Sequence, residues 1–337
     1  MRFLSDYRHL ISALTFRRVV NLLKLTSSYY LSLLMRRTIH WGNPYSISVE
    51  PSTLCNLSCP ECPSGLKQFS RPTGILSKNM YYTILEELSD DLIYLILYFQ
   101  GEPYTNNKIL DFVQMAKQRK IYVATSTNGH YLDDNNAKKT VLSKLDRIII
   151  SLDGTDAATY RQYRRNGDFD TVIAGIKNLV KWKKELKSST PFISLQFLVL
   201  KTNEHQIKEI KKLGKSLGVD SVDLKTAQFY HPNDRDVPIP SNRKYSRYHL
   251  LKNGNYVLNN KFPNHCYRMW STCVITWNGW VVPCCFDKNA DHNYGDINEL
   301  PFSEIWNGDE TNKFRNAIFR KRTCFEICRN CTEGLRR

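Results

Sequence analysis

Acidic residues are scarce at the start of this 337-residue chain: the first 44 residues contain Asp6 as their single acid, against seven arginines and lysines. The imbalance extends to the whole chain, where 48 Lys and Arg stand against 32 Asp and Glu, a formal net charge of +16. So basic a chain indicates an anionic partner, which can be a membrane surface, a nucleic acid or an acidic substrate. Charge alone does not choose among these.

A hydrophobic run long enough to cross a bilayer is missing from this basic segment, because its longest uncharged stretch is residues 25–35. Apolar residues at Phe16, Val19, Val20 and Leu23 have helical spacing, so we predict a basic amphipathic helical segment over residues 1–44. Such a helix can lie in a membrane interface, giving a peripheral contact at the inner face of the membrane. The broad apolar face favours the alternative, a helix packed on the next domain with its arginines in solvent.

Cysteine is absent between Cys62 and Cys266, so the ten cysteines fall into two groups. The beginning of the sequence does not have the pattern of a secretory signal, and the chain is too long to be a small disulfide-stapled domain. We therefore expect a cytoplasmic protein with thiols kept reduced. Two separate groups of thiols predict two metal sites.

Internal repeats and low-complexity tracts are also absent, and the middle of the chain alternates strand-like and helix-like segments. Helical periodicity fills the gaps between the strands, as in Met80, Ile84, Leu85 and Leu88 after a Ser77 cap. Repeated βα units require parallel strands joined by crossover helices, so we predict an α/β fold, a partial (β/α)6 barrel of the TIM type. The expected strands are residues 45–50, 93–99, 121–125, 147–151, 192–200 and 221–227.

The composition divides the chain into four parts. The basic segment (1–44) precedes the barrel (45–227), and a linker rich in turn residues (228–262) precedes a cysteine-rich carboxyl-terminal part (263–337). We expect little regular structure in the linker beyond a short pairing element at residues 256–258.

Cys55, Cys59 and Cys62 lie directly after the first predicted strand, separated by three and then two residues. Three thiolates at this spacing can hold three irons of a 4Fe-4S cluster and leave the fourth iron open. No His or fourth Cys lies nearby, whereas a structural zinc site closes with four ligands and usually uses C-x2-C pairs. Zinc and purely structural thiols remain the alternatives.

This motif and its position resemble the signature of the radical S-adenosylmethionine (radical SAM) enzymes. The resemblance implies that SAM binds the open iron and that an electron, supplied by a reductase or flavodoxin-type donor, cleaves SAM to a 5′-deoxyadenosyl radical, which removes hydrogen from the substrate. One position departs from the family: Glu61 precedes the last cysteine, where an aromatic residue that packs near adenine is common. The departure puts that adenine contact in doubt.

Residues directly after the predicted strands face the ligand side of a parallel α/β fold. After the second strand, Gly101-Glu102-Pro103 is similar to the family's Gly-Gly-Glu element, which meets the methionyl amine of SAM. The resemblance implies that polar groups after the third and fourth strands bind the ribose and carboxylate of SAM. These groups are Thr127, Asn128, Ser151 and Asp153.

Basic and aromatic residues gather just beyond the fourth strand. They can contact an anion or the substrate at the barrel mouth, or form a solvated helix face, and the sequence favours neither. They are Tyr160, Arg161, Tyr163, Arg164 and Arg165.

Seven cysteines follow residue 262, around an Asn278-Gly279 turn that predicts a β-hairpin. With Gly295-Asp296 and Ile305-Trp306, this pattern resembles the SPASM extension of radical SAM enzymes, or its shortened form called twitch. The resemblance implies an auxiliary 4Fe-4S cluster, with Cys324 as a rival for one ligand position and a zinc knuckle as the alternative. Cys273 and Cys285 are then buried apolar side chains. The predicted ligands are Cys266, Cys284, Cys328 and Cys331.

These features predict a radical SAM oxidoreductase that oxidises or crosslinks its substrate, with the auxiliary cluster as electron acceptor. The substrate is a small molecule, such as a carbohydrate or lipid-linked metabolite, or a peptide. The 44 residues before the barrel are too few for the winged-helix peptide-recognition domain of many peptide maturases, which favours a small molecule. A nucleic-acid substrate is disfavoured because the basic residues are spread along the chain without an RNA-binding module. A zinc-stabilised binding protein is the non-enzyme alternative.

Overall fold

The structure, a computed structural model, describes residues 2–332. Its strands are β1 (Ser46–Val49), β2 (Tyr94–Ile96), β3 (Tyr122–Thr127), β4 (Arg147–Ser151), β5 (Phe192–Val199), β6 (Ser221–Thr226), β7 (Tyr248–Leu250), β8 (Tyr256–Leu258), β9 (Thr272–Ile275), β10 (Trp280–Val282) and β11 (Gly295–Asp296). Its α-helices are α1 (Arg2–Ser12), α2 (Phe16–Met35), α3 (Pro63–Leu66), α4 (Lys78–Leu88), α5 (Ile109–Gln118), α6 (Asp134–Leu142), α7 (Ala157–Tyr163), α8 (Phe169–Glu185), α9 (Ile207–Leu217), α10 (Arg268–Ser271), α11 (Phe302–Asn307), α12 (Asp309–Lys321) and α13 (Glu326–Arg329). Short 3₁₀ turns are η1 (Pro103–Thr105), η2 (Glu204–Gln206), η3 (Arg243–Tyr245) and η4 (Arg322–Cys324).

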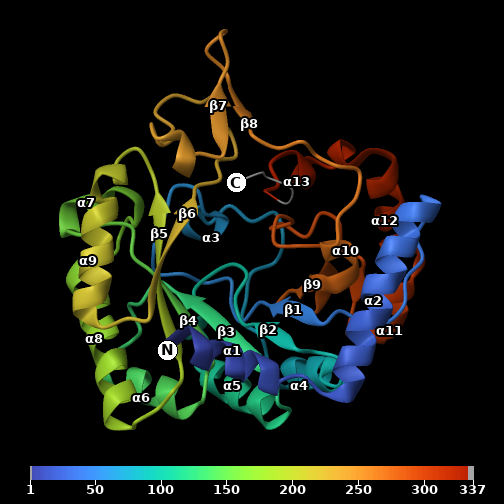
Figure 1. The fold of residues 1–337 in the computed structure, drawn as a ribbon, viewed down its shortest axis with the longest axis horizontal. Helices are drawn as coiled ribbons and strands as arrows, with labels where there is room; N and C mark the ends of the chain where they lie inside the picture. The colour runs from blue at the N-terminus through green and yellow to red at the C-terminus, as the bar shows by residue number, and fades with distance from the viewer. Residues whose placement is uncertain (1, 333–337) are drawn as a thin grey trace.

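The central sheet confirms the predicted α/β architecture with its open, partial barrel. Within the described residues, nine strands form one sheet in the order β11-β10-β9-β1-β2-β3-β4-β5-β6. Strands β1 to β6 are parallel and adjacent in chain order, and α4, α5, α6, α8 and α9 surround them on the outside (Figure 1). The carboxyl ends of β5 and β6 point toward α3, β7 and β8, so the barrel mouth lies at the top of Figure 1.

Fully buried aliphatic side chains fill the space between the strands and the outer helices. Ile47, Leu95 and Val123 are in register on three neighbouring strands, and none of them is exposed. Each such side chain stabilises the fold by about 1.5–3 kcal/mol through its removal from water. The helix start predicted at Ser77 is confirmed, because its side chain accepts a hydrogen bond from the Met80 amide at 3.1 Å.

Helix α6 was missed because it carries little apolar periodicity, and α7 overlaps a segment for which a helix face was one of two alternatives. Helix α6 has the sequence DNNAKKTVL, and it is capped by Asp133, whose side chain accepts from the Asn136 amide. It buries Ala137 and Val141, too few positions to mark a helix in the sequence. Helix α7 is short and begins after the Asp156 cap.

The segment before the barrel forms two helices and not one, and α2 packs along the outer side of the molecule, at the right of Figure 1. We predicted that its apolar face packs inward and its arginines face solvent, and this orientation is wrong. Phe16, Val19 and Leu23 are exposed, whereas Arg18 is buried. No helix among residues 2–332 combines the length and the apolar character that crossing a membrane requires.

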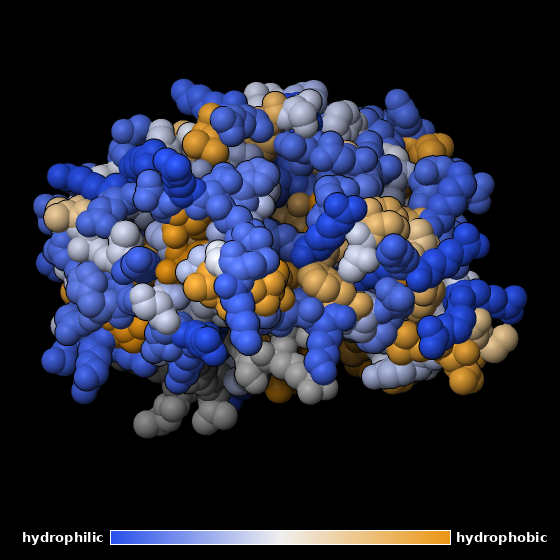
Figure 2. Space-filling model, turned by 90° about the horizontal axis from the view of Figure 1, so that it is seen from above, coloured by the Kyte–Doolittle hydropathy of each residue, from blue (hydrophilic) through white to orange (hydrophobic). Residues whose placement is uncertain are grey.

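The short pairing element predicted at residues 256–258 of the linker is confirmed as β8, and its partner strand β7 was not predicted. Strands β7 and β8 form a two-stranded antiparallel hairpin, joined by a turn in which Gly254 has a φ of +84°. This hairpin projects above the barrel mouth (Figure 1). Seen from above, this end of the molecule is mostly hydrophilic, with apolar side chains showing between charged ones (Figure 2).

The predicted carboxyl-terminal hairpin is confirmed as β9 and β10, with a turn at Gly279 (φ +98°). Its first strand, β9, pairs in parallel with β1 over four residues. The cysteine-rich part of the chain therefore continues the barrel's own sheet on the side of β1.

Candidate active site

The loop that follows β1 carries Cys55, Cys59 and Cys62 to the carboxyl end of the sheet, and all three are free thiols. Helix α3 begins directly after Cys62, with Pro63 at its first position. Gly65 lets this helix lie against the loop, since a Cβ there would come within 2.6 Å of the Cys59 amide nitrogen. The local sequence therefore fixes the backbone of the middle cysteine.

Polar groups from the barrel approach two of these sulfurs. The side-chain amide of Asn128 lies 3.8 Å from Cys55 Sγ, and the Leu57 amide lies 3.5 Å from the same sulfur. A guanidinium nitrogen of Arg164 lies 3.8 Å from Cys59 Sγ. Burial raises the pKa of the Cys55 thiol to about 11 and also raises the pKa of Cys59. These thiols need a nearby cation before they ionise at neutral pH.

The turn after β2 places Glu102 beside the cysteine loop. Gly101 has a φ of +69°, and a Cβ at this position would lie 2.3 Å from the Ser52 carbonyl oxygen, so the turn requires glycine. The buried Glu102 carboxylate accepts hydrogen bonds from the Asn128 amide at 2.7 Å and the Thr127 hydroxyl at 2.8 Å. Burial, opposed by these hydrogen bonds, raises the pKa of Glu102 to about 7. Pro103 begins η1, and Glu102 caps that turn.

The residues predicted after β3 and β4 separate into two groups. Thr127 and Asn128 lie against Glu102, and Asn128 also donates to Asn56 Oδ1 at 2.8 Å. Asp153 is buried, but its carboxylate accepts from the Leu198 amide at 2.7 Å and pairs with Arg164 at 2.6 Å. Asp153 therefore positions an arginine beside Cys59.

Ser151 is buried at the end of β4. Its contact with SAM, like those of the other residues after the strands, stays a prediction.

Two further residues belong to this site and were not singled out from the sequence. Asn56 lies inside the cysteine motif, but the motif is defined by its cysteines alone. Its side-chain oxygen accepts a hydrogen bond from the Asn128 side chain. Arg164 was grouped with four other residues, but the group divides in the structure: Tyr160 is fully buried, and Arg161 pairs with Asp168 at the surface. A buried aspartate at a strand end requires a cation, and that requirement is the clue that singles out Arg164.

A second group of thiols lies in the carboxyl-terminal part. The cysteines Cys266, Cys284, Cys328 and Cys331 line one small cavity with apolar side chains around it. Arg322 donates to Cys331 Sγ at 3.1 Å from the same wall. Burial raises the pKa of Cys328 to about 12 and that of Cys284 well above its usual range.

The remaining carboxyl-terminal thiols lie elsewhere. Cys324 is exposed, and its thiol donates to the Lys321 carbonyl oxygen at 2.8 Å. Cys273 is buried in β9, as expected for an apolar filler, whereas Cys285 is exposed, against our prediction that it is buried. Across residues 2–332, no three Cys, His, Asp or Glu side chains form a group that fits a single metal ion.

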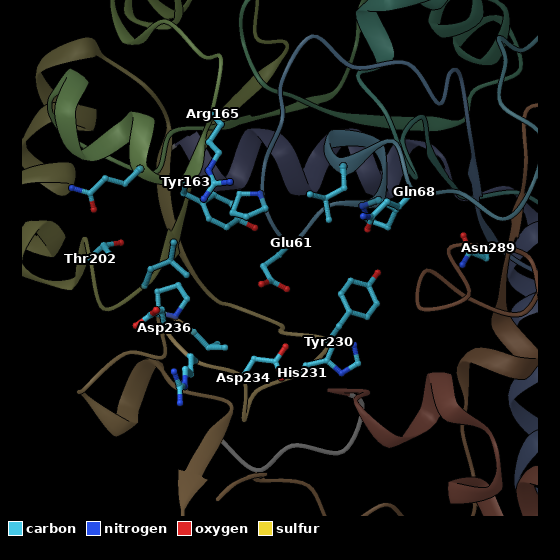
Figure 3. Close-up of a pocket in the computed structure, with 18 residues that line it drawn as sticks. Glu61, Gln68, Tyr163, Arg165, Thr202, Tyr230, His231, Asp234, Asp236 and Asn289 are labelled. Carbon is cyan, nitrogen blue, oxygen red and sulfur yellow. The ribbon is translucent and has the colours of Figure 1, made fainter.

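A cavity of about 570 Å³ opens at the barrel mouth (Figure 3). Glu61, which precedes Cys62, points into it between Tyr163 and Tyr230. His231 and Asp234 line the opposite side (Figure 3).

The auxiliary part also reaches this cavity. Asn289 contributes to its lining, and the neighbouring Lys288 lies over the Tyr230 ring with its nitrogen 4.6 Å from the ring centroid. Burial lowers the pKa of Lys288, and the neighbouring Glu61 carboxylate opposes that change. The cavity is thus bordered by the first cysteine loop, the strand ends and the auxiliary part.

Comparison with known families agrees with this geometry. Residues 49–213 match the radical SAM superfamily, and residues 266–332 match the iron-sulfur cluster-binding domain called SPASM. The chain belongs to the radical SAM superfamily. It is a radical SAM enzyme with a carboxyl-terminal SPASM domain.

Among the relatives of this radical SAM enzyme is the tungsten-containing aldehyde ferredoxin oxidoreductase cofactor-modifying protein of Pyrococcus furiosus, 24% identical over 319 residues (84% of this chain and 86% of the relative). The PqqA peptide cyclase of Gluconobacter oxydans is 25% identical over 311 residues, covering 86% and 82% of the two chains. The structure of anSMEcpe with bound AdoMet and the Cp18Cys peptide shares the fold, with a TM-score of 0.60 and 16% identity over 85% of this chain and 88% of that chain.

The radical SAM and SPASM domains imply that the enzyme uses SAM and 4Fe-4S clusters. The residues present fit these groups. The first loop offers three thiols with hydrogen-bond donors next to two of the sulfurs, the kind of contact that tunes a cluster. The second site offers four thiols around one enclosed apolar cavity, with a guanidinium beside them.

Proposed function

We propose that this enzyme abstracts hydrogen from an unactivated C–H bond of a polar substrate in the mouth cavity and completes a two-electron oxidation or crosslink. SAM and its cluster, when bound, supply one-electron cleavage of a carbon–sulfur bond, and the auxiliary cluster supplies an electron acceptor. The observation that carries this proposal is the position of the 570 Å³ cavity, which Glu61 and Asn289 line from both cysteine-bearing parts of the chain.

The groups after β1, β2 and β3 support an assignment of the residues that would hold SAM and its cluster. Cys55, Cys59 and Cys62 would ligate the first cluster. Glu102 would accept the methionyl ammonium, since its buried carboxylate lies beside the cysteine loop. Thr127 and Asn128 hold that carboxylate in place through their own hydrogen bonds and line the same corner of the site.

The auxiliary cluster would be ligated by the four cysteines that share one cavity, which leaves no open iron for substrate. A fully ligated cluster suits electron acceptance better than substrate binding. The four ligands would be Cys266, Cys284, Cys328 and Cys331.

Glu61 is the best placed group to accept the proton that a two-electron oxidation releases. Its carboxylate faces the cavity, and burial raises its pKa, while Lys288 and His231 oppose that rise. A carboxylate whose pKa is raised toward the working pH is a better general base than an exposed one. A role of Glu61 toward substrate would account for the departure from the family at this position.

The cavity limits the class of substrate. A volume of about 570 Å³ accommodates a small molecule or a few residues of a peptide, and its lining mixes acids, bases and tyrosines. Two relatives named for modifying a cofactor and for cyclising a peptide support both classes. The polar lining favours a substrate rich in hydroxyl, amino or carboxylate groups.

An anaerobic test separates the parts of this proposal. The reconstituted wild type should contain about eight irons and release 5′-deoxyadenosine when reduced with SAM, whereas Cys55→Ala/Cys59→Ala/Cys62→Ala should retain about four irons and release none. About four irons in the wild type, lost in the triple variant, would remove the auxiliary cluster and with it the electron acceptor.

The role of Glu61 is tested by screening fractions of small metabolites and of peptides for stimulation of 5′-deoxyadenosine release. With a stimulating fraction, Glu61→Gln should still release 5′-deoxyadenosine but yield about 100-fold less product, as expected for loss of a general base. Gln68→Glu, on the same cavity wall, is the matched control and should keep product and 5′-deoxyadenosine in step. Full product formation by Glu61→Gln would contradict the assignment.

A further inference from the structure

The inward face of α2 mixes the apolar Leu25 and Tyr29 with polar side chains, and backbone groups of neighbouring segments bind these polar side chains. The Arg18 guanidinium donates to four backbone carbonyl oxygens at 2.6–2.8 Å, and two of them belong to the loop before β3. Asn21 exchanges hydrogen bonds with the Asn43 backbone at 2.8 and 2.9 Å, and Ser32 bonds both backbone groups of Ile39. Rotating α2 to bury its other face would break all of these bonds, so its orientation is fixed.

The outward face of α2 carries exposed apolar side chains in its first and last turns, with Thr26 and Ser27 between them. The exposed fractions are 86% for Phe16, 38% for Val19, 61% for Leu23, 64% for Tyr30 and 78% for Leu34. At 100° per residue these five side chains, which we call the outer stripe, fall within an arc of about 60° over roughly 27 Å of helix. Large apolar side chains gathered on one face at the surface of a folded protein mark an interaction site.

Positive charge surrounds the outer stripe. Lys24 lies on α2, and Arg36 and Arg37 follow its end; all three are exposed. The acids near this part of the chain are paired: Asp6 with Arg147 of the barrel at 2.5 Å, and Asp90 and Asp91 with Arg17 at 2.7 and 3.3 Å. The partner that matches an apolar stripe flanked by cations is the surface of an anionic bilayer.

We infer that α2 is a membrane-surface helix, which inserts the outer stripe into the headgroup region of an anionic bilayer and holds the enzyme there. The helix is not apolar enough to span the bilayer, and its inward face is occupied by the barrel, so it lies in the plane of the interface. Apolar insertion and attraction of Lys24, Arg36 and Arg37 to lipid phosphate both contribute. This inference does not depend on the proposed reaction.

Substitution of the outer stripe is the direct test, because deletion of α2 would also remove the buried Arg18 and Leu25 and uncover the surface that they cover. Sedimentation with phosphatidylcholine vesicles containing phosphatidylglycerol should capture the wild-type protein. The variant Phe16→Ser/Leu23→Ser/Leu34→Ser should bind roughly tenfold more weakly or worse, with an unchanged melting temperature. Leu142→Ser/Leu250→Ser, which changes two leucines elsewhere that are 53% and 52% exposed, is the matched control and should bind as the wild type does.

A second set of binding experiments tests whether membrane binding requires the positive charges. Removing phosphatidylglycerol, raising salt, or making Lys24→Glu/Arg37→Glu should each weaken binding several-fold. Equal binding of wild type and the serine variant to the vesicles, or no binding of the wild type, would overturn the inference. So would a wild-type dimer in size-exclusion chromatography that the serine variant converts to monomer, since the stripe would then bind a second copy of the chain.

Discussion

The buried carboxylate of Glu102 makes a prediction at the scale of one residue. Its pKa is raised to about 7 by burial, so near neutral pH it is partly protonated before SAM binds. Glu102→Gln keeps the shape but removes the charge that would face the methionyl ammonium. We expect a loss of about 1.5–3 kcal/mol of SAM binding free energy, roughly a 10- to 150-fold higher Kd, measured by anaerobic equilibrium dialysis.

The same residue sets the pH dependence of SAM binding. The methionyl ammonium favours the ionised carboxylate, so SAM binding below about pH 7 releases a proton from Glu102. The affinity for SAM should therefore rise with pH up to about 7. An α-amino group titrates at a higher pH, about 7.7–8.0, so it does not cause this rise. Glu102→Gln should flatten this profile, and Asp134→Asn on the surface of α6 should leave it intact. A wild-type profile that is flat between about pH 5.5 and 7 would contradict the role of Glu102.

How much of the site was predictable depends on how local its determinants are. Cys55, Cys59, Cys62 and Glu102 were found because a short motif or a strand-end turn carries each of them. Arg164 was not separated from its neighbours, because its role depends on a partner on another element, Asp153, and on the fold that brings both to Cys59. Spacing along the chain does not contain that information.

At the scale of elements, a buried ion pair joins β1, the cysteine loop and the carboxyl-terminal part. Arg71 pairs with Glu50 through two hydrogen bonds of 2.6 and 2.8 Å, and it also donates to the Lys288 carbonyl oxygen at 2.8 Å. Arg71→Met leaves the Glu50 carboxylate buried without its partner. We expect it to destabilise the protein by about 3–5 kcal/mol, measured by anaerobic urea unfolding.

Two companion variants identify the cause of that loss. Glu50→Leu/Arg71→Met removes both charges and should recover part of the stability, because no buried charge is left unpaired. Arg161→Met at the exposed pair with Asp168 should cost at most about 1 kcal/mol. A loss for Arg71→Met no larger than for Arg161→Met would show that this pair does not join the two parts.

The elements themselves were predicted unevenly. Strands such as β4 and β5 were found because they are largely buried apolar runs, and β6, which is only partly buried, because it follows a periodic helix. Helix α6 was missed because it buries few apolar residues. The orientation of α2 was predicted wrongly, since an apolar face normally packs inward. The carbonyl groups that bind Arg18 belong to segments as distant in the sequence as Lys120. The sequence of the helix alone does not predict these partners.

At the scale of the whole molecule, the SPASM domain and the barrel share one sheet. Val274 and Ile275 of β9 are in register with Ser48 and Val49 of β1, the strand that leads into the first cysteine loop. The two cysteine sites are thus connected through adjacent strands. Loss of a ligand at the auxiliary site should therefore lower the stability of the barrel as well. The proposed ligand set turns this connection into a prediction.

Cys328 and Cys324 form a matched pair for that prediction, since they lie four residues apart but differ in burial. Cys328 lines the apolar cavity with three other cysteines, whereas Cys324 is exposed and donates to the Lys321 carbonyl oxygen. Cys328→Ser should lower the iron content from about eight to about four and lower the melting temperature, because metal binding adds to folding free energy. Cys324→Ser should keep about eight irons and the wild-type melting temperature. If Cys324→Ser loses irons and Cys328→Ser does not, Cys324 is the ligand, and the auxiliary cluster lies closer to the surface than the cavity places it.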